Sequence, residues 1–111
     1  MLGRRHRFHG HNSLRAVYRR GQTVRGSMLS LKFSQRPGKP LRVGVVVSRK
    51  VSKSAVVRNR IRRRLYEQVR QHSDKLAGYD LVFMAYDEQL ASLPAEQMSQ
   101  LVEDMLDKAK L

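Results

Sequence analysis

The sequence has no cysteine and no tryptophan, and its aromatic residues are four tyrosines and three phenylalanines. Without cysteine, disulfide bonds, thiolate catalysis and cysteine-ligated zinc sites are excluded. No apolar run approaches the ~20 residues that span a bilayer. The N-terminal segment lacks the apolar core of a secretory signal, although its arginine content leaves a transit peptide open. We therefore expect a cytoplasmic protein that spans no membrane.

Acidic residues are also scarce, with 9 Asp and Glu against 23 Lys and Arg, so the formal net charge is +14. Residues 1–72 hold 20 basic groups and one acidic group, whereas residues 73–111 hold 3 basic and 8 acidic groups. Solubility needs a net charge of only ~2–8 in a small domain. Such concentrated positive charge repels itself unless it meets a polyanion, and a phosphate backbone is the obvious one. The charge predicts nucleic-acid binding, with an anionic membrane surface or another acidic partner as alternatives.

The remaining composition is that of a folded protein, because 41% of the residues are hydrophobic and 29% are charged. A chain of 111 residues is expected to form one domain. We therefore expect a single nucleic-acid-binding domain over residues 1–111, in which residues 1–12 form a flexible basic arm.

Hydrophobic periodicity predicts three helices and at least three strands. In chain order, the expected elements are a helix over 12–20, strands over 28–34 and 41–48, a helix over 52–72, a buried strand over 80–86, a loop over 87–93 and a helix from residue 94. A short extra strand at Thr23–Arg25 would give the order α-β-β-β-α-β-α. This order predicts an α+β fold of two layers, with helices on a mixed sheet of about four strands.

One helix dominates the functional interpretation, because five arginines occupy the seven positions 58–64. At about 100° per residue, five side chains form an outward stripe away from the apolar residues Val57, Ile61 and Leu65. The members of this stripe are Asn59, Arg62, Arg63, Tyr66 and Arg70. Arg60 and Arg64 lie on the other flank, where Glu67 can pair with either.

Arginine suits phosphate binding because its planar fork donates two hydrogen bonds and also stacks on bases. Asn59 adds an amide that both donates and accepts, and Tyr66 could offer a stacking face. Like charges at i and i+4 destabilise an isolated helix, so their crowding favours a polyanionic partner over a merely solvated basic helix.

Other motifs carry less information. His6, His9 and His11 lack the acidic or thiolate ligands that would complete a metal site, so RNA contact is the better interpretation. Asp87 and Glu88 are adjacent on a loop and form no spaced carboxylate pair. With no nucleophile–base pair in the sequence, we expect no catalytic side chain and no protein-bound metal.

The Arg-rich helix and the strand before it resemble the protein component of bacterial ribonuclease P. The stretch Gly44–Val51, followed by Ala55–Arg63, is similar to that family's strand end and its helix signature R-N-x-x-(K/R)-R-x-x-R-E. The signature is matched at Arg58, Asn59, Arg62, Arg63 and Glu67. Tyr66 departs from it, because the family usually has arginine there.

This resemblance implies an accessory role in an endoribonuclease that matures tRNA 5′ ends. In the family, the RNA subunit hydrolyses the phosphodiester with bound Mg²⁺, which is held mainly by RNA and substrate. The protein docks on that RNA, one protein per catalytic RNA, and holds the 5′ leader of precursor tRNA in a cleft. No organic cofactor or membrane partner is implied. The family also has an unusual left-handed βαβ crossover, against a general preference of about 98% for the right-handed form.

The resemblance assigns residues to two surfaces. Contacts with the RNA subunit are expected from Arg49, Lys50, Lys53, Arg58, Asn59, Arg60, Arg62, Arg63, Tyr66 and Arg70. The leader cleft, between the first helix and the polar face of the sheet, would be lined by Leu14, Tyr18, Ser30, Lys32 and Val46. Phe8 is a further candidate for this cleft, with packing against the sheet as the alternative. The family usually has an aromatic residue where Leu14 stands and often another where Lys32 stands, so base stacking should be weaker and a phosphate contact from Lys32 should replace part of it.

Two other functions stay open on the residues alone. A ribosomal or other structural RNA-binding protein would share the charge but would need no leader cleft. An independent metal-dependent nuclease would need a carboxylate cluster, which the sequence does not show.

Overall fold

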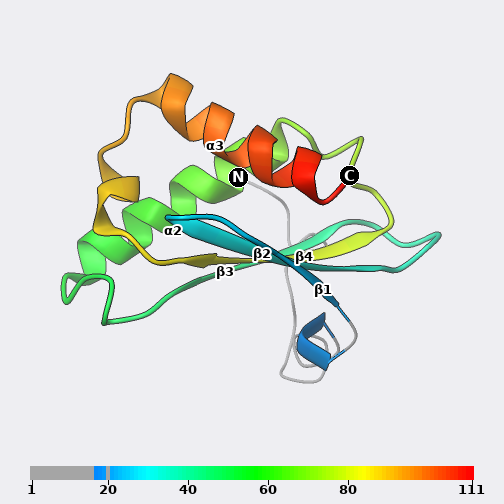
Figure 1. Ribbon diagram of the computed structural model, residues 1–111, viewed down its shortest axis with the longest axis horizontal. Helices are drawn as coiled ribbons and strands as arrows, with labels where there is room; N and C mark the ends of the chain where they lie inside the picture. The colour runs from blue at the N-terminus through cyan, green and yellow to red at the C-terminus, as the bar shows by residue number, and fades with distance from the viewer. Residues whose placement is uncertain (1–16, 20) are drawn as a thin grey trace.

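The computed structural model describes residues 17–19 and 21–111 (Figure 1). Its elements are β1 (Gln22–Arg25), β2 (Leu29–Gln35), β3 (Arg42–Val47), α2 (Ala55–Arg70), β4 (Tyr79–Ala85), the 3₁₀ helix η2 (Glu88–Ala91) and α3 (Ala95–Lys108). Of the first expected helix, Val17–Arg19 are helical. The expected basic arm and the candidate residues Phe8 and Leu14 lie outside the described residues.

The four strands form one mixed sheet in the order β1-β2-β4-β3. β2 pairs antiparallel with both β1 and β4, whereas β3 pairs parallel with β4. This confirms the α+β fold and the extra strand near Thr23–Arg25. α2 connects the parallel pair β3 and β4, as a crossover must. The left-handed sense of this crossover stays a prediction.

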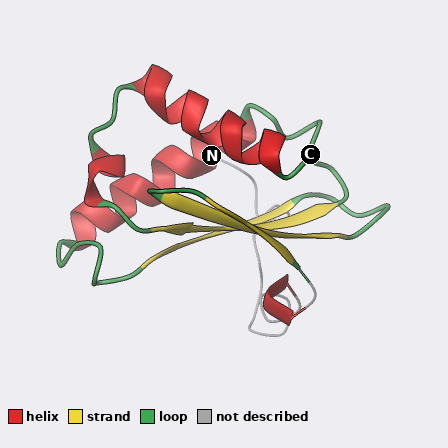
Figure 2. Ribbon diagram, in the orientation of Figure 1, coloured by secondary structure: helices red, strands yellow, loops and turns green. Residues whose placement is uncertain are grey.

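Helices α2 and α3 cover one face of the sheet, and the helical turn at residues 17–19 lies on the other side (Figures 1 and 2). The core lies between the sheet and α2 and α3, because alternate strand residues face the apolar stripes of these helices. Leu31 of β2, Ile61 of α2 and Val102 of α3 are each fully buried. Burying one such side chain stabilises the fold by about 1.5–3 kcal/mol. Among the described residues, no helix combines the length and hydropathy needed to cross a bilayer.

Two expectations about the segment after β4 are wrong. The strand ends at Ala85, and Tyr86 is 51% exposed instead of buried. The expected loop contains η2, in which Asp87 accepts a hydrogen bond from the Gln89 N–H at 2.9 Å. The buried side chain of Leu90 anchors this short helix. Periodicity over so few residues is too short to reveal a 3₁₀ turn.

The buried carboxylate of Asp80, at the start of β4, contacts Arg42 of β3 and Arg36, which follows β2. Asp80 is 3% exposed and accepts two hydrogen bonds from Arg42, at 2.9 and 2.7 Å. Arg36 Nε lies 3.0 Å from Asp80 Oδ1, and Arg36 Nη2 donates to the Pro40 carbonyl. Hydrogen bonding to Asp80 raises the pKa of Arg42 against the opposing effect of burial. This cluster therefore fixes the turn between β2 and β3 to the start of β4, and Gly38 has a positive φ in that turn (+77°).

Candidate nucleic-acid interface

The arginine-rich helix α2 begins at a side-chain cap. Ser54 Oγ accepts a hydrogen bond from the Val57 N–H at 3.3 Å, and the first turn contains no acidic residue. Ser52, where the helix is expected to start from the sequence, is buried and precedes α2. Its Oγ accepts from the Ser54 N–H at 3.2 Å and lies 3.3 Å from Glu88 Oε1, so it holds the β3–α2 loop to η2. The positive end of α2 is thus left without a neutralising carboxylate in its own first turn.

The arginines of α2 divide into two groups. Arg58 donates to the Ser52 carbonyl at 2.9 Å, and Arg64 donates to the Leu90 carbonyl at 2.7 Å and to the Leu93 carbonyl. Both side chains therefore bind backbone groups outside α2. Arg64 is a structural residue of the connection between η2 and α3, because it satisfies carbonyl groups that would otherwise lack partners.

The expected pairing of Glu67 with Arg60 or Arg64 is wrong. Glu67 pairs with Arg70, whose Nε lies 3.1 Å from Glu67 Oε2. This hydrogen bond lowers the pKa of Glu67 and raises that of Arg70. Arg64 is unavailable because its guanidinium is bound to backbone carbonyls. Arg70 remains half exposed, but part of its charge is offset by its partner.

The outward stripe remains largely accessible. Asn59 and Arg63 are exposed, and so is Arg60 on the other flank. Arg62 is half-buried, and its guanidinium is held by Asn59 Oδ1 at 2.6 Å and by the Val47 carbonyl at 3.4 Å. Tyr66 packs partly against the core, which leaves less of its ring for stacking than the sequence indicates. The stripe therefore presents Asn59 and Arg63 as exposed polar groups and Arg62 as a guanidinium held in one orientation.

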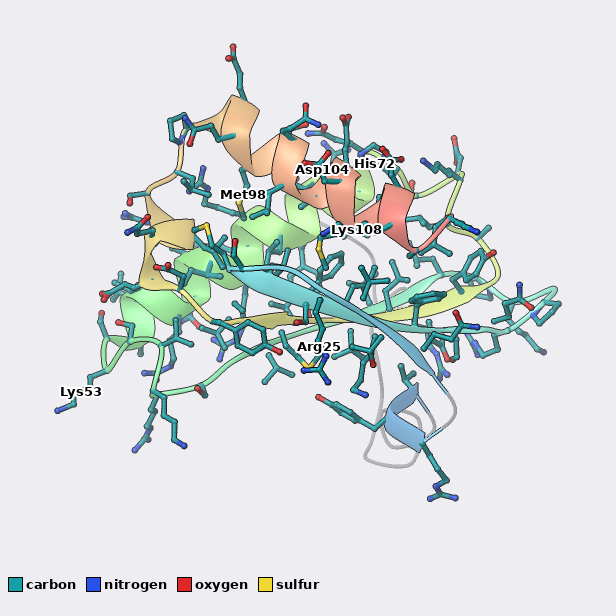
Figure 3. The ribbon with its side chains drawn as sticks, in the orientation of Figure 1. Arg25, Lys53, His72, Met98, Asp104 and Lys108 are labelled. Carbon is teal, nitrogen blue, oxygen red and sulfur yellow. The ribbon has the colours of Figure 1, made fainter. Side chains whose placement is uncertain are left out.

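The β3–α2 loop adds cations beside the N-terminus of α2. Arg49, Lys50 and Lys53 are exposed, and together with Arg58 they line a shallow pocket. Lys53 projects outward at this end of the molecule (Figure 3). We use the name α2 surface for Arg49, Lys50, Lys53, Asn59, Arg62 and Arg63. It combines exposed lysine charges with an arginine held by Asn59 Oδ1 and the Val47 carbonyl, a combination suited to contacts with phosphate groups.

Because the arginines of α2 divide into two groups, we expect them to contribute differently to the stability of the fold. Replacing Arg64 with alanine is expected to lower the free energy of unfolding by about 2 kcal/mol, because two carbonyls lose hydrogen bonds to a charged donor. Urea denaturation followed by circular dichroism measures this change. Arg63→Ala is the matched control, because Arg63 is exposed and makes no hydrogen bond to the described part of the chain. If both variants unfold alike, Arg64 has no structural role.

The second surface is the face of the sheet opposite α2 and α3. Strand alternation places Ser30 and Lys32 of β2 on this face, with Met84 of β4 and Val46 of β3 beside them. Val46 is 39% exposed, whereas Ser30 is only 2% exposed. We call this surface the open face. Ser30 thus lies on the expected face, but as a covered residue.

The helical turn at residues 17–19 brings an aromatic ring to the open face. Lys32 Nζ lies 5.6 Å from the centroid of the Tyr18 ring and donates to Thr23 Oγ1 at 3.1 Å. Tyr18 is 40% exposed, and Val17 beside it is fully buried. A cation over an exposed ring contributes about 0.5–1 kcal/mol. The structure therefore combines charge and stacking surface at one point, as the sequence predicts for Tyr18 and Lys32.

A close approach fixes this turn against β2. The Gly21 N–H donates to the Val17 carbonyl at 2.8 Å. A Cβ at residue 21 would lie 2.4 Å from the Val17 oxygen and 2.9 Å from the Phe33 oxygen. Only glycine therefore fits where the chain passes from the helical turn into β1, which is what places Tyr18 over the open face.

Two residues of the open face are missed by the sequence interpretation. Arg25 of β1 lies opposite Ser30, and Met84 of β4 lies between Ser30 and Val46. The exposed side chain of Arg25 projects from the sheet on the side away from α2 and α3 (Figure 3). The alternation of β1 and β4 would have predicted both, once the order of the strands was known.

The described acidic side chains do not fit a metal centre. No group of three or more His, Asp or Glu side chains comes together within residues 17–19 and 21–111. Asp80 is bound by two arginines, and Glu67 is bound by Arg70. These carboxylates are therefore engaged as structural anions rather than as ligands for a hard cation.

Comparison with known proteins decides the family. A model of the Ribonuclease P family matches residues 2–110. The chain belongs to this family. It is 43% identical over 90 residues to the ribonuclease P protein component of Synechococcus sp. (strain JA-2-3B'a(2-13)), covering 77% of this chain and 68% of that protein. It is 47% identical over 74 residues to the component from Clostridium kluyveri, covering 64% of this chain and 65% of that protein.

A solved structure has the same fold. The ribonuclease P protein of Staphylococcus aureus superposes with a TM-score of 0.81 over 95% of both chains, at 23% sequence identity. The α+β architecture is thus that of a ribonuclease P protein, and the resemblance inferred from the helix signature is confirmed.

Proposed function

We propose that this ribonuclease P protein binds the catalytic RNA subunit through the α2 surface and the 5′ leader of precursor tRNA through the open face. The observation that carries the proposal is that the chain presents two accessible surfaces of different character. The α2 surface offers charge and amide donors for a structured backbone, and the open face adds the Tyr18 ring and the apolar Val46. A single strand needs both a stacking platform and cations.

The protein would act by binding RNA and neutralising phosphate charge, and not by transferring protons. Asp80 and Glu67 are engaged by arginines, and we assign phosphodiester hydrolysis to the RNA subunit. Magnesium would be held there and on the substrate, because Mg²⁺ prefers phosphate oxygens and retained water. Cations on the open face would lower the repulsion between leader and RNA subunit. This function assists endonucleolytic formation of tRNA 5′ ends and places the protein in the cytoplasm, one copy per catalytic RNA.

Reconstitution tests this proposal. The protein is combined with a bacterial ribonuclease P RNA, and single-turnover cleavage of precursor tRNA is measured as the Mg²⁺ concentration is lowered. We expect faster cleavage than with RNA alone at low Mg²⁺, and a larger gain for a long leader than for a leader of one nucleotide. No gain at any Mg²⁺ concentration would refute the proposal. A gain that is independent of leader length would indicate a structural RNA-binding role instead.

A further inference from the structure

We propose that Tyr86 is a base-stacking platform for the leader strand, at the end of the open face. This inference rests on the proposed function and names a residue that determines which substrates are held. It comes from an exposed aromatic ring that the sequence interpretation expects to be buried.

The backbone places Tyr86 in register with the sheet although β4 ends one residue earlier. The Tyr86 N–H donates to the Met28 carbonyl at 2.9 Å, which continues the pairing of Leu29 with Ala85. Side chains alternate along an extended strand. Ala85 faces the core, so Tyr86 follows Met84 onto the open face.

The ring of Tyr86 is accessible there. Its side chain is 51% exposed, and its hydroxyl makes no hydrogen bond to the described part of the chain. Val46 of the neighbouring strand pairs with Met84 in the adjacent row and is 39% exposed. Tyr86 and Val46 thus expose an aromatic ring and an apolar side chain on the same face, which offers a surface on which a base can stack.

Cationic side chains lie near Tyr86, where they would neutralise the phosphates of a bound strand. Arg49 and Lys50 lie two and three residues beyond Val47, the last residue of β3, which pairs with Ala85. Both cations are therefore near the end of the sheet at which Tyr86 lies, and both are exposed. Aromatic stacking beside backbone-neutralising cations is how proteins hold single strands without reading their sequence.

Tyr86 also adds aromatic stacking surface to the open face, which otherwise has little of it. Lys32 lies over one side of the Tyr18 ring. Tyr86 is four residues along β4 from Val82, the partner of Lys32, which corresponds to roughly 13 Å along the strand. The two tyrosines would thus contact different nucleotides of one leader.

The test uses the reconstituted holoenzyme and measures its affinity for precursor tRNA and for mature tRNA without a leader. Tyr86→Ala is expected to weaken precursor binding by about 5- to 10-fold, the lower end of base stacking because the ring is half exposed. Affinity for mature tRNA should not change. Tyr86→Phe, which keeps the ring, should bind precursor as the wild type does. Gln100→Ala on the opposite side of the molecule is the control for an exposed substitution.

Leaders with one abasic nucleotide locate the contact. An abasic site at the stacked position should weaken binding to the wild type but not weaken binding to Tyr86→Ala any further. Equal losses for precursor and mature tRNA, or no loss in Tyr86→Ala, would overturn the assignment of Tyr86. If the wild type itself binds precursor and mature tRNA equally, the leader-binding function fails together with it. A wild type that prefers precursor while Tyr86→Ala is unchanged refutes only the role of Tyr86.

Discussion

Replacing both Arg62 and Arg63 with alanine is expected to weaken binding to a bacterial ribonuclease P RNA by roughly 100-fold, because two charge-assisted contacts are lost. Arg62 is held in place by Asn59 Oδ1 and the Val47 carbonyl, so its fork is oriented before RNA binds. Pre-orientation reduces the entropy lost on binding. Filter binding at several salt concentrations should also show a salt dependence that is shallower by about 0.7–0.9 log unit per lost phosphate contact.

A charge-matched variant separates specific contacts from bulk charge. Lys75→Ala combined with Lys108→Ala removes the same two positive charges from exposed positions outside the α2 surface, and Lys108 lies on α3 (Figure 3). If only net charge matters, both double variants will lose the same affinity. A much smaller loss in the lysine variant supports the α2 surface, whereas equal losses would contradict it.

Local pattern was sufficient to predict the elements that build the fold. Alternation predicted the strand containing Leu31, and spacing by four predicted the buried stripe of Ile61 and Leu65. Both patterns report which side of an element faces apolar surroundings, and this preference is strong for large side chains. The helix signature predicted the family for the same reason that it predicted an RNA surface, since both depend on residues within one helix.

Contacts between distant segments could not be predicted in this way. Arg64 binds carbonyls of Leu90 and Leu93, which lie more than twenty positions away along the chain. No feature of the sequence distinguishes Arg64 from Arg63 except its angle on the helix. The role of each arginine depends on where η2 packs, and η2 itself was expected to be a loop.

On the open face as well, local sequence pattern could not predict which side chains are exposed. Tyr18 and Lys32 were predicted to share a surface because the family resemblance supplied their tertiary relationship. Tyr86 was expected to be buried because Asp80–Tyr86 is an almost continuous apolar run. Such a run predicts that both faces of the strand are buried, but it cannot show that the elements packed on the strand leave its last residue exposed.

Asp80 gives the prediction with the largest expected effect on stability. Asp80→Ala would remove the carboxylate that both Arg36 and Arg42 contact at the end of the sheet. Removing one partner of a buried ion pair costs about 3–5 kcal/mol, and we expect about 3 kcal/mol because both guanidinium groups keep partial contact with water. Urea denaturation measures the loss, and Asp80→Asn should recover part of it by keeping one acceptor oxygen.

The pair Glu67–Arg70 provides the contrasting case within the same chain. Its geometry is comparable, with three hydrogen bonds from the guanidinium to the carboxylate, but both side chains are about half exposed. An exposed ion pair gains little because water solvates each charge almost as well. Glu67→Ala should therefore leave the free energy of unfolding nearly unchanged while Asp80→Ala lowers it strongly. Similar losses in the two variants would show that burial does not determine the contribution of Asp80.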